Sequence, residues 1–271
     1  MMILKHILNN HCHSTMYCKE EKMSNYQQLI QNFERLGLNR IKEYFPNYLE
    51  AINSQSIPFT EALLELTKQE LAYKESKKIE RAIIKARFPM VKRMEDFEFG
   101  FQPSLNKTQL LDLQHLSFID KQENIILIGS PGVGKSHLAI SIGVSACEQG
   151  IRTLFINCHE LLVRLQNAYD NGTIERVLRR YANYELLIID EIGYLPIQKQ
   201  EANLLFQLIN ARYERNSTIF TTNSSLSGWG DVFKNPTATA AILDRLVHHS
   251  HIFKITGKSY RLKDHQENIQ K

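Results

Sequence analysis

The stretch Ile125-Ile-Leu-Ile-Gly-Ser-Pro-Gly-Val-Gly-Lys-Ser136 decides the fold of this 271-residue chain. An apolar run typical of a buried strand leads into the pattern Gly-x-x-x-x-Gly-Lys-Ser, and a helix is expected over residues 136–149. The glycines let backbone N–H groups point inward as a nest for phosphate oxygens, and the helix start adds partial positive charge. We therefore expect nucleotide binding by Gly129, Ser130, Pro131, Gly132, Val133, Gly134, Lys135, Ser136 and His137.

A second apolar run, Leu186-Leu-Ile-Ile-Asp-Glu191, ends in two carboxylates. Ligands of open α/β sheets bind outside the carboxyl ends of the strands, so these carboxylates should face the same nucleotide. Lys135 should reach the β- and γ-phosphates, while Ser136 and Asp190 should ligate Mg²⁺. Glu191 should orient or deprotonate an attacking water, which favours hydrolysis of ATP over phosphoryl transfer to a metabolite.

Polar and basic residues later in the chain complete the candidate site. Asn223, at the end of Thr218-Ile-Phe-Thr-Thr-Asn223, is expected near the γ-phosphate, with Thr222 as a weaker candidate. The alternative for Asn223 is an ordinary turn after a strand. Arg245 lies near the end of an expected helix, where it either complements the helix dipole or acts on a neighbouring subunit's nucleotide. Arg261 follows the last expected strand.

The order of elements predicts an α/β domain with a five-stranded parallel sheet flanked by helices, preceded by a small all-helical domain. The expected strands are 125–128, 153–156, 186–189, 218–221 and 252–255. We expect a disordered appendage over residues 1–22, a helical N-terminal domain over 23–100 that contacts DNA or a partner, the nucleotide-binding domain over 101–263, and a tail over 264–271.

Composition excludes several classes of protein. Hydrophobic residues make up 43% of the chain and charged residues 23%, which does not fit a mainly disordered, collagen-like or coiled-coil chain. The apolar N-terminus is too short for a membrane span, and the four cysteines form no Cys-x-x-Cys pair, so a cytoplasmic protein is expected. His11, Cys12, His13 and Cys18 lack the spacing of a zinc site.

The positive charge of the chain, +4 overall, is concentrated in residues 68–93, which hold nine Lys or Arg and three Glu. Helical spacing places Lys74, Lys78, Arg81 and Lys85 in one stripe. The stripe is either a solvated helix face or a surface that binds DNA phosphates without reading bases. Arg176, Arg179 and Arg180 are the alternative DNA contact.

Further segments accompany these motifs: Phe206-Gln-Leu-Ile-Asn-Ala-Arg-Tyr-Glu-Arg215, Gly228-Trp-Gly230, Ile242-Leu-Asp-Arg-Leu-Val-His-His249 and Gly257-Lys-Ser-Tyr-Arg261. With them, residues 24–263 closely resemble the IstB-type helper ATPases of insertion sequences, within the AAA+ group. The resemblance implies a Walker A role for Lys135 and Ser136, a Walker B role for Asp190 and Glu191, and a sensor role for Asn223. It also implies a trans arginine finger at Arg245 and a cis sensor at Arg261.

The same resemblance implies a function. ATP bound between subunits would assemble a homo-oligomer, a ring or a filament, on double-stranded DNA. The assembly would recruit the cognate transposase through the N-terminal helices, and hydrolysis would release it. A DnaC-like helicase loader and a non-hydrolysing, nucleotide-gated DNA-binding scaffold are the alternatives. His248, His249 and His251 match the family pattern without an assigned chemistry and are interpreted as structural.

Overall fold

The computed structural model describes residues 23–54 and 56–262, so the predicted appendage and tail lie outside the described residues. The described residues divide into two compact units, with the boundary between Glu75 and Ser76. This division lies inside the long helix α3 (Phe59–Ala86), whereas the sequence places the domain boundary near residue 100. Each unit is described by itself below.

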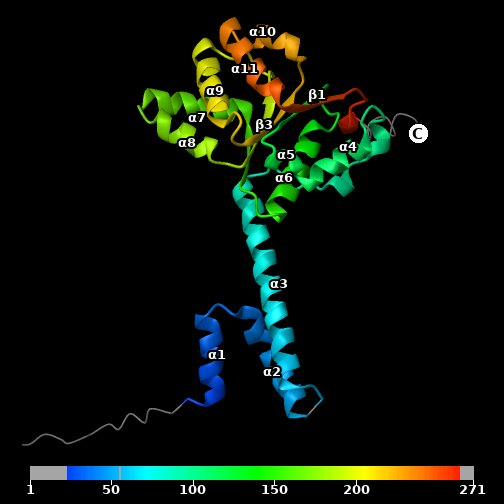
Figure 1. The fold of residues 1–271 in the computed structure, drawn as a ribbon, viewed down its shortest axis with the longest axis vertical. Helices are drawn as coiled ribbons and strands as arrows, with labels where there is room; N and C mark the ends of the chain where they lie inside the picture. The colour runs from blue at the N-terminus through cyan, green and yellow to red at the C-terminus, as the bar shows by residue number, and fades with distance from the viewer. Residues whose placement is uncertain (1–22, 55, 263–271) are drawn as a thin grey trace, which may run out of the picture. The chain divides into compact units, whose positions relative to one another are not determined.

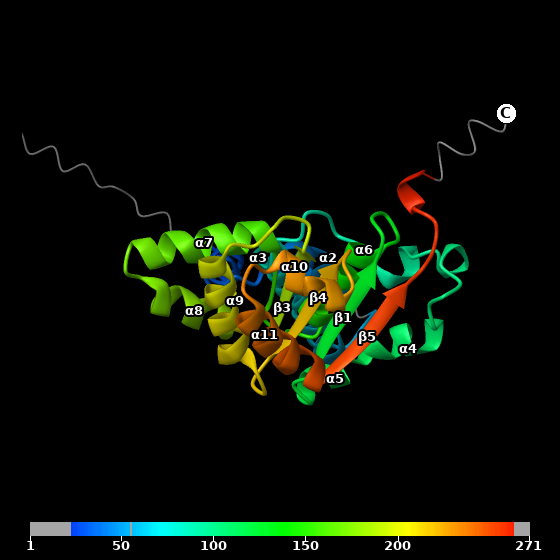
Figure 2. The same cartoon turned by 90° about the horizontal axis from the view of Figure 1, so that it is seen from above.

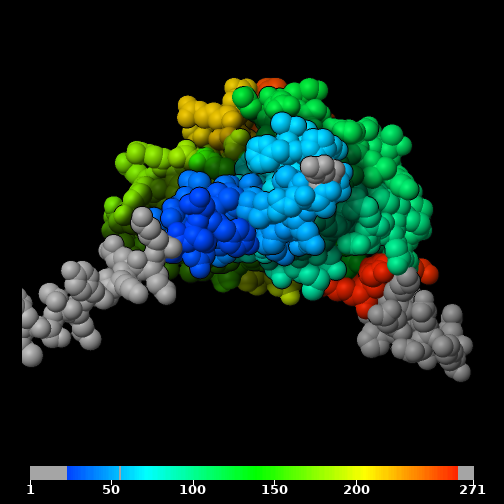
Figure 3. Space-filling view, turned by 90° about the horizontal axis from the view of Figure 1, so that it is seen from below, coloured from blue at the N-terminus to red at the C-terminus, as the bar shows by residue number. Residues whose placement is uncertain are grey.

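The first unit is helical, with α1 (Asn25–Arg35), α2 (Asn39–Asn53) and the first part of α3 (Figure 1). Figure 3 shows the surface of these helices in blue and light blue. Ser24 begins α1 with a capping box that it shares with Gln27. The Glu70 carboxylate on α3 accepts hydrogen bonds from the first backbone N–H groups of α2, at 2.8 and 3.1 Å. A buried carboxylate at a helix N-terminus satisfies free N–H groups and complements the helix dipole, so it fixes α2 against α3.

The second unit contains the five-stranded parallel sheet that the sequence predicts, in the order β2-β3-β4-β1-β5. Figure 2 shows β3, β4, β1 and β5 side by side in that order. Its strands are β1 (Asn124–Gly129), β2 (Thr153–Asn157), β3 (Leu186–Ile192), β4 (Ser217–Thr222) and β5 (Ser250–Ile255). Its helices beyond α3 are α4 (Lys107–Asp112), α5 (Ser117–Asp120), α6 (Lys135–Glu148), α7 (Cys158–Asp170), α8 (Ile174–Ala182), α9 (Lys199–Arg212), α10 (Trp229–Val232) and α11 (Pro236–His248). Single turns of 3₁₀-helix lie at residues 94–96, 99–101, 113–115, 226–228 and 260–262.

Alternating side chains of the strands build two apolar layers, one on each face of the sheet. Ile125 and Leu127 of β1 belong to the layer that includes α6, while Ile126 between them belongs to the layer under α7, α9 and α11. This follows from the two-residue period of a strand that is buried on both faces. Because the strands are parallel, the carboxyl ends of β1, β3 and β4 lie at the same end of the sheet, where the candidate site lies.

No described helix has both the length and the apolar character that crossing a membrane requires.

Candidate nucleotide-binding site

One cavity of about 760 Å³ gathers most of the predicted site residues. Side chains from the phosphate loop, from the ends of β3 and β4 and from the segment after β5 line it together. They include Lys135, Ser136, Glu191, Asn223 and Arg261. Elements far apart in the sequence thus converge where a parallel sheet places its ligands.

The phosphate loop needs glycine at two of its positions. Gly132 has φ +82° and Gly134 has φ +101°, a region that favours glycine. A Cβ atom on Gly132 would collide with the Ser259 side chain, and one on Gly134 would collide with the ring of Phe97. The backbone N–H of Tyr260 donates to the Gly132 carbonyl at 2.9 Å, which ties the chain after β5 to the loop.

Lys135, the first residue of α6, is buried, and its ammonium group donates to the carbonyls of Gly129 and Ser130 at 2.7 and 2.9 Å. Burial lowers the pKa of Lys135, while the carboxylates of Asp190 and Glu191 act in the opposite direction. An ammonium group stripped of much of its hydration interacts strongly with an anion. Lys135 therefore fits the phosphate-binding role predicted for it.

Ser136 and Asp190 meet at the bottom of the site. The Ser136 hydroxyl lies 2.8 and 3.0 Å from the two carboxylate oxygens of Asp190, which is buried. Thr221 on β4 adds a fourth oxygen, because its hydroxyl donates to Asp190 Oδ1 at 2.5 Å. Hydroxyl and carboxylate oxygens are the donors that Mg²⁺ prefers, so these residues fit the ion predicted here.

Glu191 lies at a bulge near the carboxyl end of β3. The pairing of β3 with β4 shifts between Ile189 and Ile192, and Glu191 itself has φ +63°. Bulges of this kind redirect side chains next to active sites. Whereas Asp190 is buried against Ser136 and Thr221, Glu191 is exposed and lines the cavity. The Glu191 N–H donates to Thr221 Oγ1 at 2.9 Å.

Two polar residues at this end of the sheet, Asn157 and Thr221, were not predicted as site residues from the sequence. Asn157, the last residue of β2, lies beside Asp190 in the sheet, and its Nδ2 donates to Glu191 Oε2 at 2.8 Å. Thr221 contacts both acidic residues, whereas the hydroxyl of Thr222 pairs with the backbone of Ser224. Asn157 could have been found by applying to β2 the strand-end rule that singled out Glu191.

Asn223 and Arg261 are exposed at the cavity, as the predicted sensor roles require. Asn223 directly follows β4. The Tyr260 hydroxyl donates to Glu98 Oε1 at 2.8 Å, so the residue before Arg261 is held by both its backbone and its side chain. His137 also lines the cavity, with Nε2 2.9 Å from the Arg93 carbonyl.

Apolar side chains line part of the same cavity. Met90, Val91, Phe97 and Phe101 come from the segment between α3 and β1, to which the sequence analysis assigned no nucleotide contact. Ligand sites combine apolar surface with a few polar groups that fix orientation. These four side chains give the cavity an apolar surface, of the kind against which the base and sugar of a nucleotide can pack.

Arg245 lies outside this cavity. Its Nε donates to Asn210 Oδ1 at 2.9 Å, and its guanidinium lies over the Phe206 ring, 4.9 Å from the centroid. Arg245 is partly exposed on α11, and both of these contacts join it to α9. Within one chain, Arg245 therefore does not complete the site that it was predicted to serve.

A second hollow, of about 880 Å³, collects basic side chains of the second unit. Lys78, Arg81 and Lys85 of the predicted stripe line it, and so does Arg180, one of the alternative DNA contacts. Arg87 and Arg152 line it as well. Lys74 belongs to the first unit, where its ammonium lies 3.8 Å from Glu70 Oε1.

The IstB-like ATP binding protein family matches this chain over residues 31–268. The chain belongs to that family. A Bacillus thuringiensis subsp. berliner protein named for insertion sequence IS232 and for ATP binding is 44% identical over 242 residues, covering 89% of this chain and 97% of that protein. A Pseudomonas aeruginosa relative, named for insertion sequence IS21 and for ATP binding, is 40% identical over 230 residues, covering 85% and 87%.

Solved structures show the fold that this IstB-like chain shares with other AAA+ proteins. The replication initiator DnaA bound to AMPPCP and single-stranded DNA aligns with a TM-score of 0.53 at 19% identity, over 68% of this chain and 55% of DnaA. DnaI aligns with a TM-score of 0.52 at 19% identity, over 61% of this chain and 91% of DnaI. The predicted AAA+ fold and the predicted IstB-like family are confirmed, and membership of this ATP-binding family supports ATP as the nucleotide.

Proposed function

We propose that this IstB-like protein hydrolyses ATP with Mg²⁺ and serves as the DNA-binding helper of a transposase. The observation that supports the proposal is that Lys135, Ser136 and Glu191 line one cavity. There the Ser136 hydroxyl contacts Asp190, and the Asn157 amide contacts Glu191. A phosphate nest alone binds a nucleotide. A carboxylate held at the mouth of the same cavity adds the base that hydrolysis needs.

Each residue has a role that follows from its position. Lys135 and the loop N–H groups bind phosphate oxygens. Glu191 accepts a proton from water, because it is the exposed carboxylate that lines the cavity directly after Asp190 on β3. Asn223 and Arg261 bind the terminal phosphate. Ser136 and Asp190 would hold Mg²⁺, which neutralises charge on the phosphates when bound.

Arg245 acts between subunits in this proposal. It lies outside the cavity of its own chain and is partly exposed on α11, so it is available to the site of a neighbour. A guanidinium group inserted there would stabilise the charge of the transition state. ATP would then favour the homo-oligomer, a ring or a filament, and hydrolysis would release it.

Duplex DNA and the transposase are the proposed partners. The hollow lined by Lys78, Arg81, Lys85 and Arg180 supports contact with DNA phosphates. The names of the relatives place them in insertion sequences, which supports a role in transposition. The N-terminal helices, residues 23–100, are the proposed contact for the transposase.

Phosphate release in the presence of duplex DNA tests the proposal. Glu191→Gln should still bind ATP and stay assembled on DNA, while its turnover falls to background. Glu160→Gln, an exposed carboxylate on α7, is the matched control and should keep full turnover. Turnover near background in both wild type and Glu191→Gln would instead indicate a non-hydrolysing, nucleotide-gated scaffold, and a strong preference for single-stranded DNA would indicate a helicase loader.

A further inference from the structure

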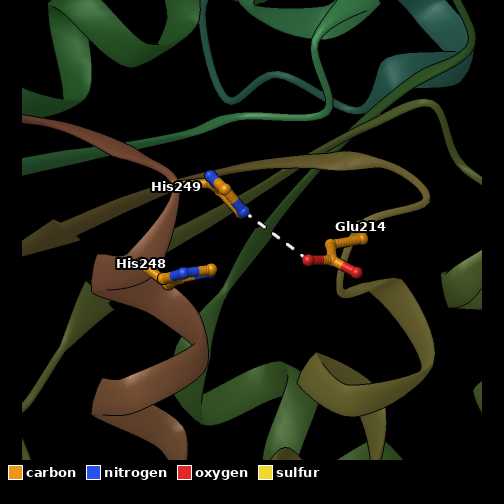
Figure 4. A group of neighbouring side chains, drawn as sticks. All are labelled: Glu214, His248 and His249. Carbon is orange, nitrogen blue, oxygen red and sulfur yellow. Dashed lines mark ion pairs between the residues drawn. The ribbon is translucent and has the colours of Figure 1, made fainter.

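Glu214, His248 and His249 form a compact cluster on the second unit, away from the nucleotide cavity (Figure 4). Glu214 follows α9, His248 ends α11, and His249 directly precedes β5. Each residue offers one atom that can ligate a metal, and these atoms all lie within 4.8 Å of one another. All three side chains are exposed, so an ion can reach them from solvent.

Neighbouring contacts hold the cluster in place. His249 Nε2 lies 3.5 Å from Glu214 Oε1, and the two imidazole rings lie 4.0 Å apart between centroids. The Tyr213 hydroxyl lies 2.9 Å from His248 Nδ1 and orients that ring. Partners of this kind fix the orientation of metal-bound histidines.

We propose that Glu214, His248 and His249 bind a divalent transition-metal ion of the Zn²⁺ class. Two imidazoles and one carboxylate are a three-ligand set that Zn²⁺ accepts, with the fourth position left to water. Mg²⁺ and Ca²⁺ prefer oxygen ligands, so this set selects against the ion expected in the nucleotide site.

A plain ion pair explains the cluster less well. Glu214 can pair with only one positive charge at a time, and an exposed pair of this kind contributes little stability. Protonation of both rings would place two positive charges side by side, with the guanidinium of Arg245 near the Tyr213 ring as a third. An ion bound by two neutral imidazoles avoids that repulsion, because its ligands must be deprotonated.

A bound ion would also join two elements. Glu214 comes from the chain after α9, and both histidines come from the end of α11. An ion that binds the folded arrangement and not the unfolded chain raises the unfolding temperature as its concentration increases. Binding and thermal stability therefore give two independent readouts, and neither depends on ATP hydrolysis.

The test uses the full-length chain with His11→Gln, Cys12→Ser, His13→Gln and Cys18→Ser, because those side chains could also bind metal. Excess Mg²⁺ is present to occupy the nucleotide site. Co²⁺ serves as the probe, since its visible absorption reports coordination by nitrogen and oxygen, and Zn²⁺ is then added as the competitor. Glu214→Gln and His249→Gln are the test variants.

His251→Gln is the matched control. His251 is another exposed histidine paired with a glutamate, Glu123, at 2.8 Å, but it does not belong to the cluster. We expect one equivalent of Co²⁺ that Zn²⁺ displaces, a metal-dependent rise in unfolding temperature, and affinity lowered roughly 10-fold or more in both test variants. No saturable binding, or equal binding in the test variants and His251→Gln, would overturn the proposal.

Discussion

Asn157 Nδ2 donates a 2.8 Å hydrogen bond to Glu191 Oε2, so an amide at the end of β2 holds the carboxylate at the end of β3. A carboxylate oxygen that accepts such a bond is fixed in position, and the lone pair that it uses is not available to a proton of water. In the proposed reaction Glu191 must be free to accept a proton from water. We therefore expect the Asn157 amide to restrain turnover until this hydrogen bond breaks and leaves Glu191 in position at the cavity.

Asn157→Ser tests this restraint. Serine keeps the N-cap of α7, where Asn157 Oδ1 accepts from the His159 N–H at 2.9 Å, but its side chain is too short to reach Glu191. A hydrogen bond to a charged group contributes about 1.5–3 kcal/mol. We expect phosphate release without DNA to rise by about tenfold or more, and stimulation by DNA to shrink accordingly.

His159→Ala is the control for this experiment, because His159 is exposed beside Asn157 and contributes only its backbone to the contact. Its turnover should match wild type with and without DNA. A fall in DNA-free turnover in Asn157→Ser would show the opposite role, in which the amide positions Glu191 for catalysis.

The sequence predicts those parts of the site that a local pattern encodes. The phosphate loop needs Gly132 and Gly134 at fixed spacing, and the acidic pair ends an apolar run, so both are visible without a structure. The five strands are visible for the same reason, since each is a short apolar run between helical segments. Their observed bounds differ from the predicted ones by at most three residues.

Contacts between distant elements could not be predicted this way. Thr221 meets Asp190 because β4 lies beside β3, and the order of strands is not encoded in either strand alone. The hollow that joins Lys78 to Arg180 likewise depends on how α3 and α8 pack in the second unit. The stripe and the arginines of α8 were predicted as alternative DNA contacts, and Arg180 lines the same hollow as three residues of the stripe.

Arg212 provides a stability prediction. It is buried near the ends of α8 and α9, and its guanidinium donates to the Thr218 hydroxyl and to the carbonyls of Tyr181, Ala182, Tyr184 and Ser217. Burial lowers the pKa of Arg212 to about 9, so the group stays charged at neutral pH. Its position suits a cation, because carbonyls at a helix C-terminus carry partial negative charge.

Arg212→Met should lower the free energy of unfolding by about 3–5 kcal/mol, because the buried acceptors are left without their donor. Urea denaturation measures this decrease. Arg215→Met, an exposed arginine three residues later, should change stability by less than about 0.5 kcal/mol. Equal effects of the two substitutions would contradict a structural role for the Arg212 hydrogen bonds.

The basic hollow gives a prediction about salt. Lys78→Gln, Arg81→Gln and Lys85→Gln together should reduce the slope of log affinity for duplex DNA against log salt, by about 0.9 for each phosphate that the variant no longer neutralises. Lys74→Gln is the comparison, because Lys74 lies outside the hollow and near Glu70. An unchanged slope in the triple variant would assign the stripe to a solvated helix face.

Arg245 decides whether the site is shared between subunits. Arg245→Ala should keep ATP binding, because Arg245 does not line the cavity of its own chain. DNA-stimulated turnover should fall about 10³-fold, the lower end of the range for an arginine finger. Nucleotide binding and phosphate release measured on the same preparation separate these two effects.

Mixing two inactive variants tests the arrangement directly. An Arg245→Ala subunit keeps its own Glu191, and a Glu191→Gln subunit keeps its own Arg245, so a site between the two contains both groups. A mixture should therefore recover part of the wild-type turnover, although each variant alone stays near background. If Arg245 acted only within its own chain, every subunit in the mixture would lack one of the two groups, and turnover would stay near background at every mixing ratio.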